Sequence, residues 1–483
     1  MNRKAVLHLV SYLTLVIGLA MICCSLVSVY YKEPVALRNS LLLSGGISIL
    51  FALIFGYFTR GPVNLSRRDG FGVVTFGWLS VTLFGSLPYL LSGVITHPVS
   101  ALFETMSGFT TTGASVLTQL ESIPHSIHFW RALTNWFGGM GVLVLCVAIL
   151  PFLGVGGMQI FRAEMPGPSK DRLTPRITTT AKLLWGVYLL LSISEALLLR
   201  FVGGMGWFDA VCHTFTTMAT GGFSTRSASI GAFDSVAVDL IITAFMFLAG
   251  INFSLHYHAL TGKPGRYFKD AEFRFYGGLL LIAIFIVSIH LFASGWDTFL
   301  TSLRHAAFTV VSIVTTTGFS TADFDQWPDA LRVFLVALMF FGGCAGSTGG
   351  SMKIVRVFII LKTMVREIKV FMRPSSVVIA KLGGKPIEPV IIAHICAFFA
   401  IFVLVFALGS FVMTFFTPNL ETAATSVIAT LGNIGPGLNA VGATQNYAAI
   451  PIPGQAFLTF LMLLGRLELY TVLILFLPSF WKR

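Results

Sequence analysis

The chain has 483 residues, of which 55% are hydrophobic and only 11% are charged, and its mean hydropathy is +0.84. Soluble proteins carry about 25% charged residues, so this composition excludes a soluble enzyme, a disordered chain and a small disulfide-bonded scaffold. At about 20 residues per crossing, the apolar residues suffice for about ten spans of a bilayer. We therefore expect an all-α integral membrane protein that crosses the bilayer many times.

Two classes of apolar stretch alternate along the chain. Those long enough to cross a bilayer fall at residues 6–30, 39–58, 72–95, 128–153, 182–202, 236–260, 275–294, 330–360, 390–416 and 455–478. Shorter ones lie at residues 100–111, 208–219, 299–314 and 421–431. Their length is too small for a crossing and suits re-entrant segments.

The formal net charge of +12 indicates topology rather than nucleic-acid binding. Basic residues gather in alternate loops, so that 24 of the 32 Lys and Arg fall on one side of the expected spans. An excess of this kind marks the cytoplasmic side, and ten crossings return both termini to it. The densest basic stretch, residues 353–385, is either a solvated cytoplasmic face or a docking surface for an anionic partner or membrane lipid.

Each short stretch ends in a turn rich in glycine and, in three of the four, in threonine. The turns read Phe-Thr-Thr-Thr-Gly-Ala-Ser at 109–115, Met-Ala-Thr-Gly-Gly-Phe-Ser-Thr at 218–225, Val-Thr-Thr-Thr-Gly-Phe-Ser-Thr at 314–321 and Ala-Thr-Leu-Gly-Asn-Ile-Gly-Pro-Gly at 429–437. Each lies between two expected spans, so the chain after its first two spans consists of four similar units. A fourfold unit on one chain predicts a pseudo-fourfold axis on which the turns converge.

Converging turns of this kind are suited to conducting a cation. Irregular backbone at membrane depth is tolerated only where it is buried in protein or lines water, and rings of carbonyls can replace the hydration shell of a cation. Each short helix is also expected to begin near an acid and to point its negative C-terminal end toward the cavity below. These acids are Glu104, Asp209, Asp297 and Glu421. The alternative for a single turn is helix packing through small residues, which four repeats make a poor explanation.

The resulting candidate filter residues come from all four turns. They are Thr111, Thr112, Gly113, Thr220, Gly221, Gly222, Thr316, Thr317, Gly318, Asn433, Ile434 and Gly435. Glycine permits the backbone angles that aim successive carbonyls inward. We expect a monovalent metal cation to bind at these residues.

Four further motifs accompany the turns. They are Trp136-Phe-Gly-Gly-Met-Gly141, Arg162-Ala-Glu-Met-Pro-Gly-Pro168, Gly342-Gly-Cys-Ala-Gly-Ser-Thr-Gly-Gly350 and Gly465-Arg-Leu-Glu468. Together with the turns, they resemble the TrkH/TrkG branch of the Trk/Ktr/HKT superfamily of potassium transporters over essentially the whole chain. The resemblance implies potassium uptake across the bacterial inner membrane by a homodimer with one pore per subunit.

The same resemblance implies further features. A cytosolic ring of TrkA-type regulatory subunits would bind nucleotide, whereas this chain is expected to hold no cofactor. In the wider family, Ser in the first turn accompanies sodium permeation, so Gly113 favours potassium. The fourth turn departs from the Thr-Thr-Gly pattern, and its carbonyls are therefore expected to contribute more than its side chains. We expect two leading transmembrane helices in 1–70 and pore repeats in 71–160, 161–265, 266–375 and 376–483.

The run of small residues at 342–350 predicts a loop inside the membrane. Each glycine costs a helix about 1 kcal/mol relative to alanine, so the run cannot continue a stable helix. The resemblance implies that it acts as a gate below the filter, and the alternative is a kink for close helix packing. The candidate gate residues are Gly342, Gly343, Gly346, Ser347, Thr348, Gly349 and Gly350.

Arg466 falls about halfway along the last expected span, where a buried arginine is costly. One hypothesis places it at the pore below the filter as an electrostatic barrier to cations, and we include it with the gate. The other gives it a structural bond to Glu468 or to carbonyls at helix ends. Residues two apart do not share a helix face, so Glu468 is a poor partner.

A proton- or sodium-coupled secondary transporter is the alternative function. Such carriers place ionisable groups in mid-span, and the candidates here are few: Arg466, Glu468 and Glu195. An integral-membrane enzyme would need clustered His, Asp or Glu at one membrane face. The sequence offers no such cluster, so we expect the protein not to be an enzyme.

Overall fold

The computed structural model describes residues 1–61, 66–141, 177–375 and 378–481. Within these ranges the secondary structure is helical apart from a two-stranded hairpin, β1 (Lys381–Leu382) and β2 (Lys385–Pro386). Among the same residues, six helices are long and apolar enough to span a membrane, and eight if each bent pair is counted as one span. The all-α membrane class expected from the composition is therefore confirmed.

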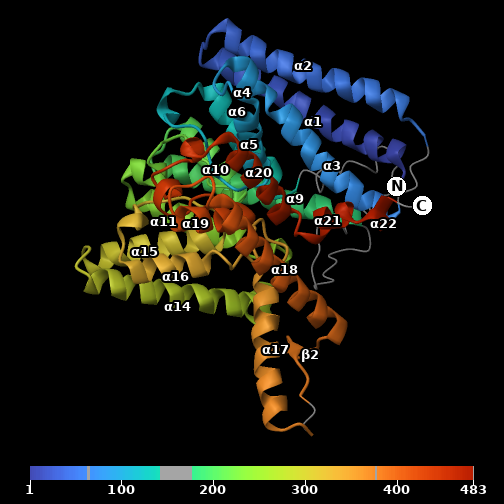
Figure 1. Cartoon of the computed structure of the whole chain (residues 1–483). Coiled ribbons are helices and arrows are strands. Elements are labelled where there is room, and N and C mark those ends of the chain that lie inside the picture. Colours follow the sequence, from blue (N-terminus) through green and yellow to red (C-terminus); the bar gives the residue numbers. More distant parts are fainter. Residues whose placement is uncertain (62–65, 142–176, 376–377, 482–483) are drawn as a thin grey trace.

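Two long helices precede the repeated units. α1 (Arg3–Tyr30) lies along α2 (Val35–Phe58) and also packs on α3 (Arg67–Gly85) (Figure 1). Gly18 and Gly45 face each other in this contact, and a Cβ on Gly45 would lie 2.8 Å from the carbonyl oxygen of Gly18. Small residues commonly let transmembrane helices approach this closely.

Four units follow, and each contains an outer helix, a short helix and an inner helix. The outer helices are α3 with its continuation α4 (Leu87–Ser92), α9 (Ile177–Phe201), α14 (Ala271–Ala293) and α18 (Pro389–Met413). The short helices are α5 (Pro98–Phe109), α10 (Trp207–Met218), α15 (Phe299–Val314) and α19 (Leu420–Leu431). The inner helices are α6 (His125–Gly139), α11 (Val236–Ala249), α16 (Asp329–Leu338) and α20 (Ile452–Arg466). The four re-entrant segments expected from the sequence are thus short helices within about two residues of the expected bounds.

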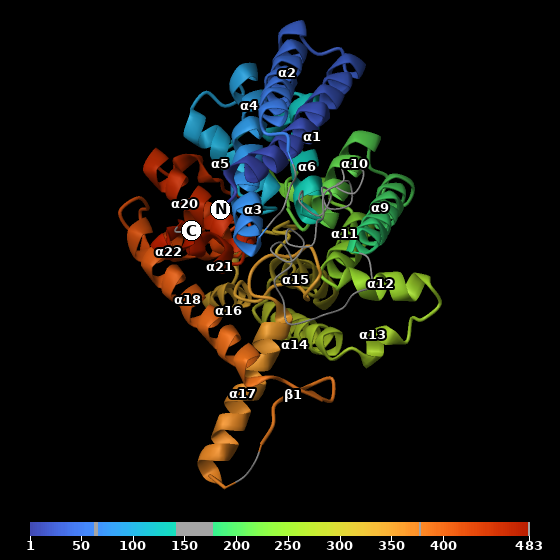
Figure 2. The ribbon, with the colours of Figure 1, turned by 90° about the vertical axis from the view of Figure 1, so that its right-hand side faces the viewer.

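The units are arranged around one central axis. Inner helix α6 packs on short helix α10 of the next unit, α11 packs on α15, and α20 of the last unit returns to α5 of the first. The Ser100 hydroxyl donates to Gln455 Oε1 over 2.7 Å across this last contact. Figure 2 shows the sequence colours running around the centre in order. The chain therefore closes a pseudo-fourfold circle.

Three of the expected spans prove to be interrupted. The backbone turns by 102° between α11 and α12 (Phe253–Leu260), and by 110° between α20 and α21 (Tyr470–Leu473). Residues 339–353 leave the helix between α16 and α17 (Ile354–Met372). The spans expected at 236–260 and 455–478 are therefore wrong as continuous helices, whereas the helix break within 330–360 includes the glycine-rich run at 342–350, as expected. Hydropathy alone cannot locate such breaks, because apolar residues continue through them.

Arg466 is the last residue of α20 and stands at the break inside the last expected span. Glu468 and Leu469 follow with positive φ of 53° and 55°, which a right-handed helix cannot contain. The second half of the span expected at 128–153 and the motif at 162–168 lie outside the described residues.

The remaining elements follow the two bends and the 342–350 loop. α12 is followed by the short α13 (Arg266–Lys269), and α21 by α22 (Pro478–Trp481). α17 projects away from the four units with the β1–β2 hairpin beside it (Figure 1). Its first residues are buried against the units, whereas Phe371 is 90% exposed near its far end.

Candidate functional site

The four glycine turns share one backbone conformation. In each turn, a residue with left-handed φ stands two positions before a glycine that also has positive φ. The first members are Thr111, Thr220, Thr316 and Asn433, with φ of 54°, 53°, 61° and 53°, and the glycines are Gly113, Gly222, Gly318 and Gly435, with φ of 79°, 67°, 80° and 103°. The fourth turn keeps this conformation although its sequence differs, because asparagine tolerates left-handed φ.

Each turn is tied to the end of its short helix in the same way. In the first, the Thr111 N–H donates to Gly108 O over 3.0 Å, and the Thr112 N–H donates to Ser107 O over 2.9 Å. The equivalent pairs of bonds recur in the other three turns. These bonds end the helix and turn the chain back toward the outer side.

The glycines of the four turns contact one another in a closed ring. A Cβ placed on Gly113 would lie 2.4 Å from Gly221 O, and one on Gly222 would lie 2.0 Å from Thr317 O. The ring continues from Gly318 to Ile434 O at 1.9 Å and from Gly435 back to Thr112 O at 2.6 Å. Each turn therefore packs its glycine against a carbonyl of the next, with no room for a side chain. All twelve candidate filter residues belong to this ring or to the turns that carry it.

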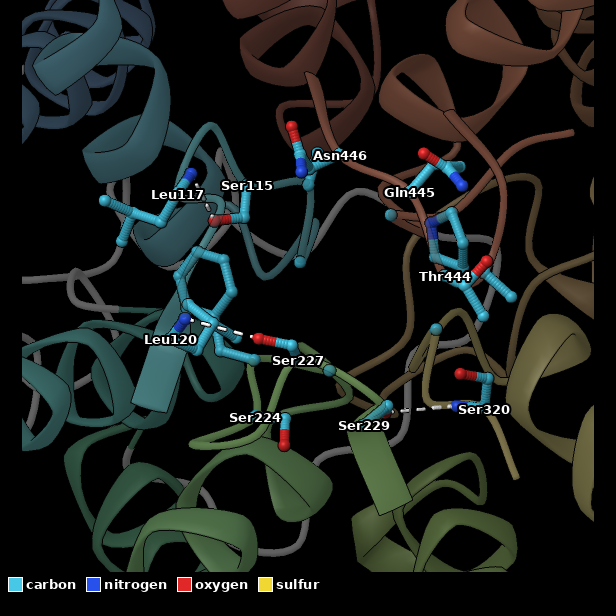
Figure 3. Close-up of a pocket in the computed structure, with 18 of the residues that line it drawn as sticks. Ser115, Leu117, Leu120, Ser224, Ser227, Ser229, Ser320, Thr444, Gln445 and Asn446 are labelled. Atoms are coloured by element: carbon cyan, nitrogen blue, oxygen red, sulfur yellow. Dashed lines mark hydrogen bonds between the residues drawn. The ribbon is translucent and has the colours of Figure 1, made fainter. Parts of the chain in front are cut away.

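A cavity opens directly outside the ring. It is lined by Gly113, Gly222, Gly318 and Gly435 and by the segments that follow each turn. Figure 3 shows these segments around a central opening, with Ser115, Ser224, Ser320 and Asn446 coming from the four units. The Ser320 N–H donates to Ser229 Oγ over 3.3 Å and ties the second unit to the third. An ion approaching from outside would meet this cavity before the ring.

The 342–350 loop lies on the other side of the ring. The Gly350 N–H donates to Thr316 Oγ1 over 2.6 Å, and a Cβ on Gly350 would lie 2.6 Å from Gly432 O. A Cβ on Gly349 would lie 3.1 Å from Thr315 O. The loop therefore touches the ends of the third and fourth short helices.

The loop is fastened at several further points. The Cys344 N–H donates to Gly250 O over 2.8 Å, and Thr348 donates to Ala249 O through its hydroxyl over 3.2 Å. Buried Glu272, at the start of α14, accepts the N–H of Ala345 over 2.7 Å and that of Val355 over 3.1 Å through Oε1. One carboxylate thus holds two distant points of this segment.

Arg466 links the loop to the first turn. Its Nη1 donates to Thr111 Oγ1 over 3.0 Å and to Thr348 O over 2.9 Å. Its Nη2 donates to the carbonyls of Gly138 and Gly139 at the end of α6. The bonds to helix-end carbonyls expected under the structural hypothesis are present. The contact with the first turn also places the guanidinium directly beneath the ring.

The spacing of two residues indicated that Glu468 is a poor partner for Arg466, and in the structure Glu468 pairs with a different residue. It forms an ion pair with Arg356 of α17, whose guanidinium lies 4.1 Å from the ring centre of Phe398. The break after α20 is thereby tied to the helix that follows the loop.

Two charged residues behind the ring were misplaced or missed from the sequence. Glu104, expected at the outer start of its helix, lies inside α5 and forms a buried ion pair with Arg131 of α6 over 2.8 Å. Asp209 and Glu421 do lie in the first turns of their helices, and Asp297 precedes Thr298, the cap of α15. Arg131 carried a signal that could have been used, since an arginine inside an apolar stretch is costly without a partner.

Four re-entrant turns around one axis, above an intramembrane loop, define a membrane protein built to pass small ions through its centre. The comparisons with known proteins agree with this class. The family model for TrkH, described as a cation transport protein, matches residues 46–483. The chain belongs to this family.

Relatives of full length support the assignment. The chain is 42% identical to the Trk system potassium uptake protein TrkH of Halomonas elongata and 39% identical to that of Escherichia coli K12, with 100% of both chains covered in each case. The crystal structure of the potassium transporter TrkH from Vibrio parahaemolyticus superposes with a TM-score of 0.89 at 35% identity, again over 100% of both chains. The resemblance inferred from the motifs is confirmed.

Proposed function

We propose that the protein takes up potassium through a filter formed by the four glycine turns. The closed ring of glycine-to-carbonyl contacts carries this proposal, because it sets carbonyls from all four units around one axis. Carbonyl oxygens in such a ring can replace the water around a potassium ion. The choice of potassium as the transported ion rests on the relatives, which are named as potassium uptake proteins.

The 342–350 loop and Arg466 form the gate of this pathway. Contact with the third and fourth short helices puts the loop across the inner exit, and Arg466 adds a positive charge beneath the first turn. Desolvating a cation beside a guanidinium is unfavourable, so this conformation is closed. Opening requires the loop to leave Thr316 and Arg466 to release Thr348.

The assembly follows the Trk pattern. The protein is a homodimer in the bacterial inner membrane, with both termini cytoplasmic, and a cytosolic TrkA-type nucleotide-binding ring controls the gate. The basic helix α17 follows the loop and projects from the four units (Figure 1), so the cytosolic regulatory subunits could act on the loop through it. The five segments expected from the sequence, 1–70 and the four pore repeats, are its structural units.

A second candidate function, coupled transport, is favoured by one observation. Glu195 of α9 is fully buried, and neither carboxylate oxygen has a hydrogen-bond partner among the described residues. The Thr217 hydroxyl approaches it but donates to His213 O over 2.7 Å. A buried carboxyl without a partner is suited to binding a proton.

Currents through the reconstituted protein separate the two functions. If flux is passive, we expect the reversal potential to follow the potassium gradient and to stay unchanged when a pH gradient is imposed. A reversal potential that shifts with pH in the native protein, and no longer shifts in the variant Glu195→Gln, would establish coupling and overturn the passive proposal.

A further inference from the structure

A buried ion pair stands directly behind the first two turns. Glu104 of α5 and Arg131 of α6 meet over 2.8 Å, and their side chains are 0% and 2% exposed. Buried pairs of this kind are weak contributors to stability, because both charges lose their water. Their position relative to the ring therefore needs another explanation.

The pair holds the segment that leaves the first turn. The Ser115 hydroxyl lies 3.0 and 3.1 Å from the two carboxylate oxygens of Glu104, and the Val116 N–H donates to Oε2 over 2.9 Å. Arg131 Nη2 also donates to Ser115 Oγ over 3.2 Å. Gly113 stands only two residues before these contacts. Charge-assisted bonds of this type are short and geometrically specific.

The same arginine reaches the second turn. Its Nη1 donates to Ser224 O over 3.1 Å, and its guanidinium lies 4.1 Å from the ring centre of Phe223. Gly222 immediately precedes Phe223. One planar guanidinium thus bridges the segments that follow Gly113 and Gly222. These two glycines belong to the first and second turns, which contact each other in the ring.

The other units have no charged equivalent of Glu104. The position nine residues before the glycine holds His213, Thr309 and Ser426 in the second, third and fourth units. His213 Nε2 lies 2.9 Å from Ser224 Oγ, so the second unit uses the position for the same purpose with a weaker group. The brace is strongest at the boundary between the first two units.

We propose that Glu104 and Arg131 are positioning residues that fix the spacing of the first and second turns, and through it the preference for potassium over sodium. The inference rests on the proposed filter. A carbonyl ring that relaxes between two turns can close around a smaller cation. Loss of the ion pair should therefore change the potassium-to-sodium ratio of entry rates more than it changes the rate of potassium entry.

The variant Arg131→Lys tests this proposal in liposomes. Lysine keeps the positive charge beside Glu104, but a single ammonium cannot bridge Glu104 and Ser224 O as a planar fork does. We expect potassium entry to persist and the potassium-to-sodium ratio of initial rates to fall about tenfold. Arg304→Lys is the matched control, because Arg304 of short helix α15 pairs with Asp239 of inner helix α11 over 3.6 Å and its described ion pair does not involve a turn.

Every outcome bears on the proposal. An unchanged ratio in Arg131→Lys would overturn it. If that variant does not reach the membrane, the double variant Glu104→Gln with Arg131→Gln, which buries no charge, is measured instead with the same expectation. Failure of both variants to assemble, with Arg304→Lys normal, would assign the pair to folding alone and would also overturn it. A native protein without potassium preference would refute the proposed filter itself, before any variant is compared.

Discussion

At the scale of single residues, the site depends on four glycines that no other residue can replace without displacing a neighbour. Each has positive φ and faces a carbonyl of the next turn. An added Cβ would therefore strain its own backbone and push against the ring at once. The threonines and Asn433 two positions earlier share the left-handed conformation, and the Asn433 amide donates to Thr112 Oγ1 of the first turn and to Met462 O, each over 3.0 Å.

The variant Gly113→Ser should lower the potassium-to-sodium permeability ratio about tenfold, equivalent to about 1.4 kcal/mol. The reason is that its Cβ would fall 2.4 Å from Gly221 O and force that carbonyl away from the axis. Gly278→Ser is the control, since Gly278 of α14 has no atom within 4 Å of an added Cβ. Reversal potentials under paired potassium and sodium solutions give the ratio. An unchanged value would remove the first turn from the filter.

Arg466 is the residue on which closure depends most. Replacing it by Gln should raise flux in the absence of any partner about tenfold, because hydrogen bonds from a charged group contribute about 1.5–3 kcal/mol each. Arg200→Gln serves as the control, because Arg200 donates to Met205 O over 3.0 Å at the outer end of α9, far from the loop. Flux through Arg466→Gln no faster than through the control would show that the guanidinium does not hold the gate.

At the scale of elements, the loop is held by an acceptor from the outer helix of its own unit. Glu272 of α14 accepts two N–H groups of the third unit's irregular segment and of α17. Because a single carboxylate oxygen makes both bonds, the start of the outer helix anchors the loop and the start of α17 at one point.

This contact predicts a contrast between two variants. Glu272→Gln retains an oxygen that can accept both N–H groups and should behave almost like the native protein. Glu272→Leu leaves two buried donors unsatisfied, at a cost of about 2–3 kcal/mol, and should both lower the melting temperature and raise basal flux. Thermal unfolding in detergent and flux in liposomes measure the two effects. Equal behaviour of the two variants would show that the loop does not depend on this acceptor.

The existence of the helices and the helix break at 342–350 were predictable from the sequence, whereas the breaks after α11 and α20 were not. The short helices α5, α10, α15 and α19 follow from apolar stretches too short to span, each ending in glycine. The inner helices α11 and α20 end at sharp bends of the backbone, and hydropathy does not reveal them because the residues beyond each bend are also apolar. The partners of Glu104 and Arg131 depend on contact between separate helices, which no local pattern encodes.

At the scale of the whole molecule, four units of unequal sequence form one ring. The circle of units is closed where α20 of the last unit packs against α5 of the first. This contact includes the hydrogen bond from Ser100 to Gln455. The units differ in their supporting residues while keeping the turn geometry.

The most direct test of the account is cation entry into liposomes that contain this chain alone. Potassium, sodium and N-methylglucamine are compared under a set potential, for the native protein and for a variant lacking residues 345–348. We expect little entry through the native protein in the closed conformation and rapid, potassium-selective entry through the shortened variant. Non-selective entry through that variant would contradict the four-turn filter, and no entry through it, with the protein folded in the membrane, would contradict the gate.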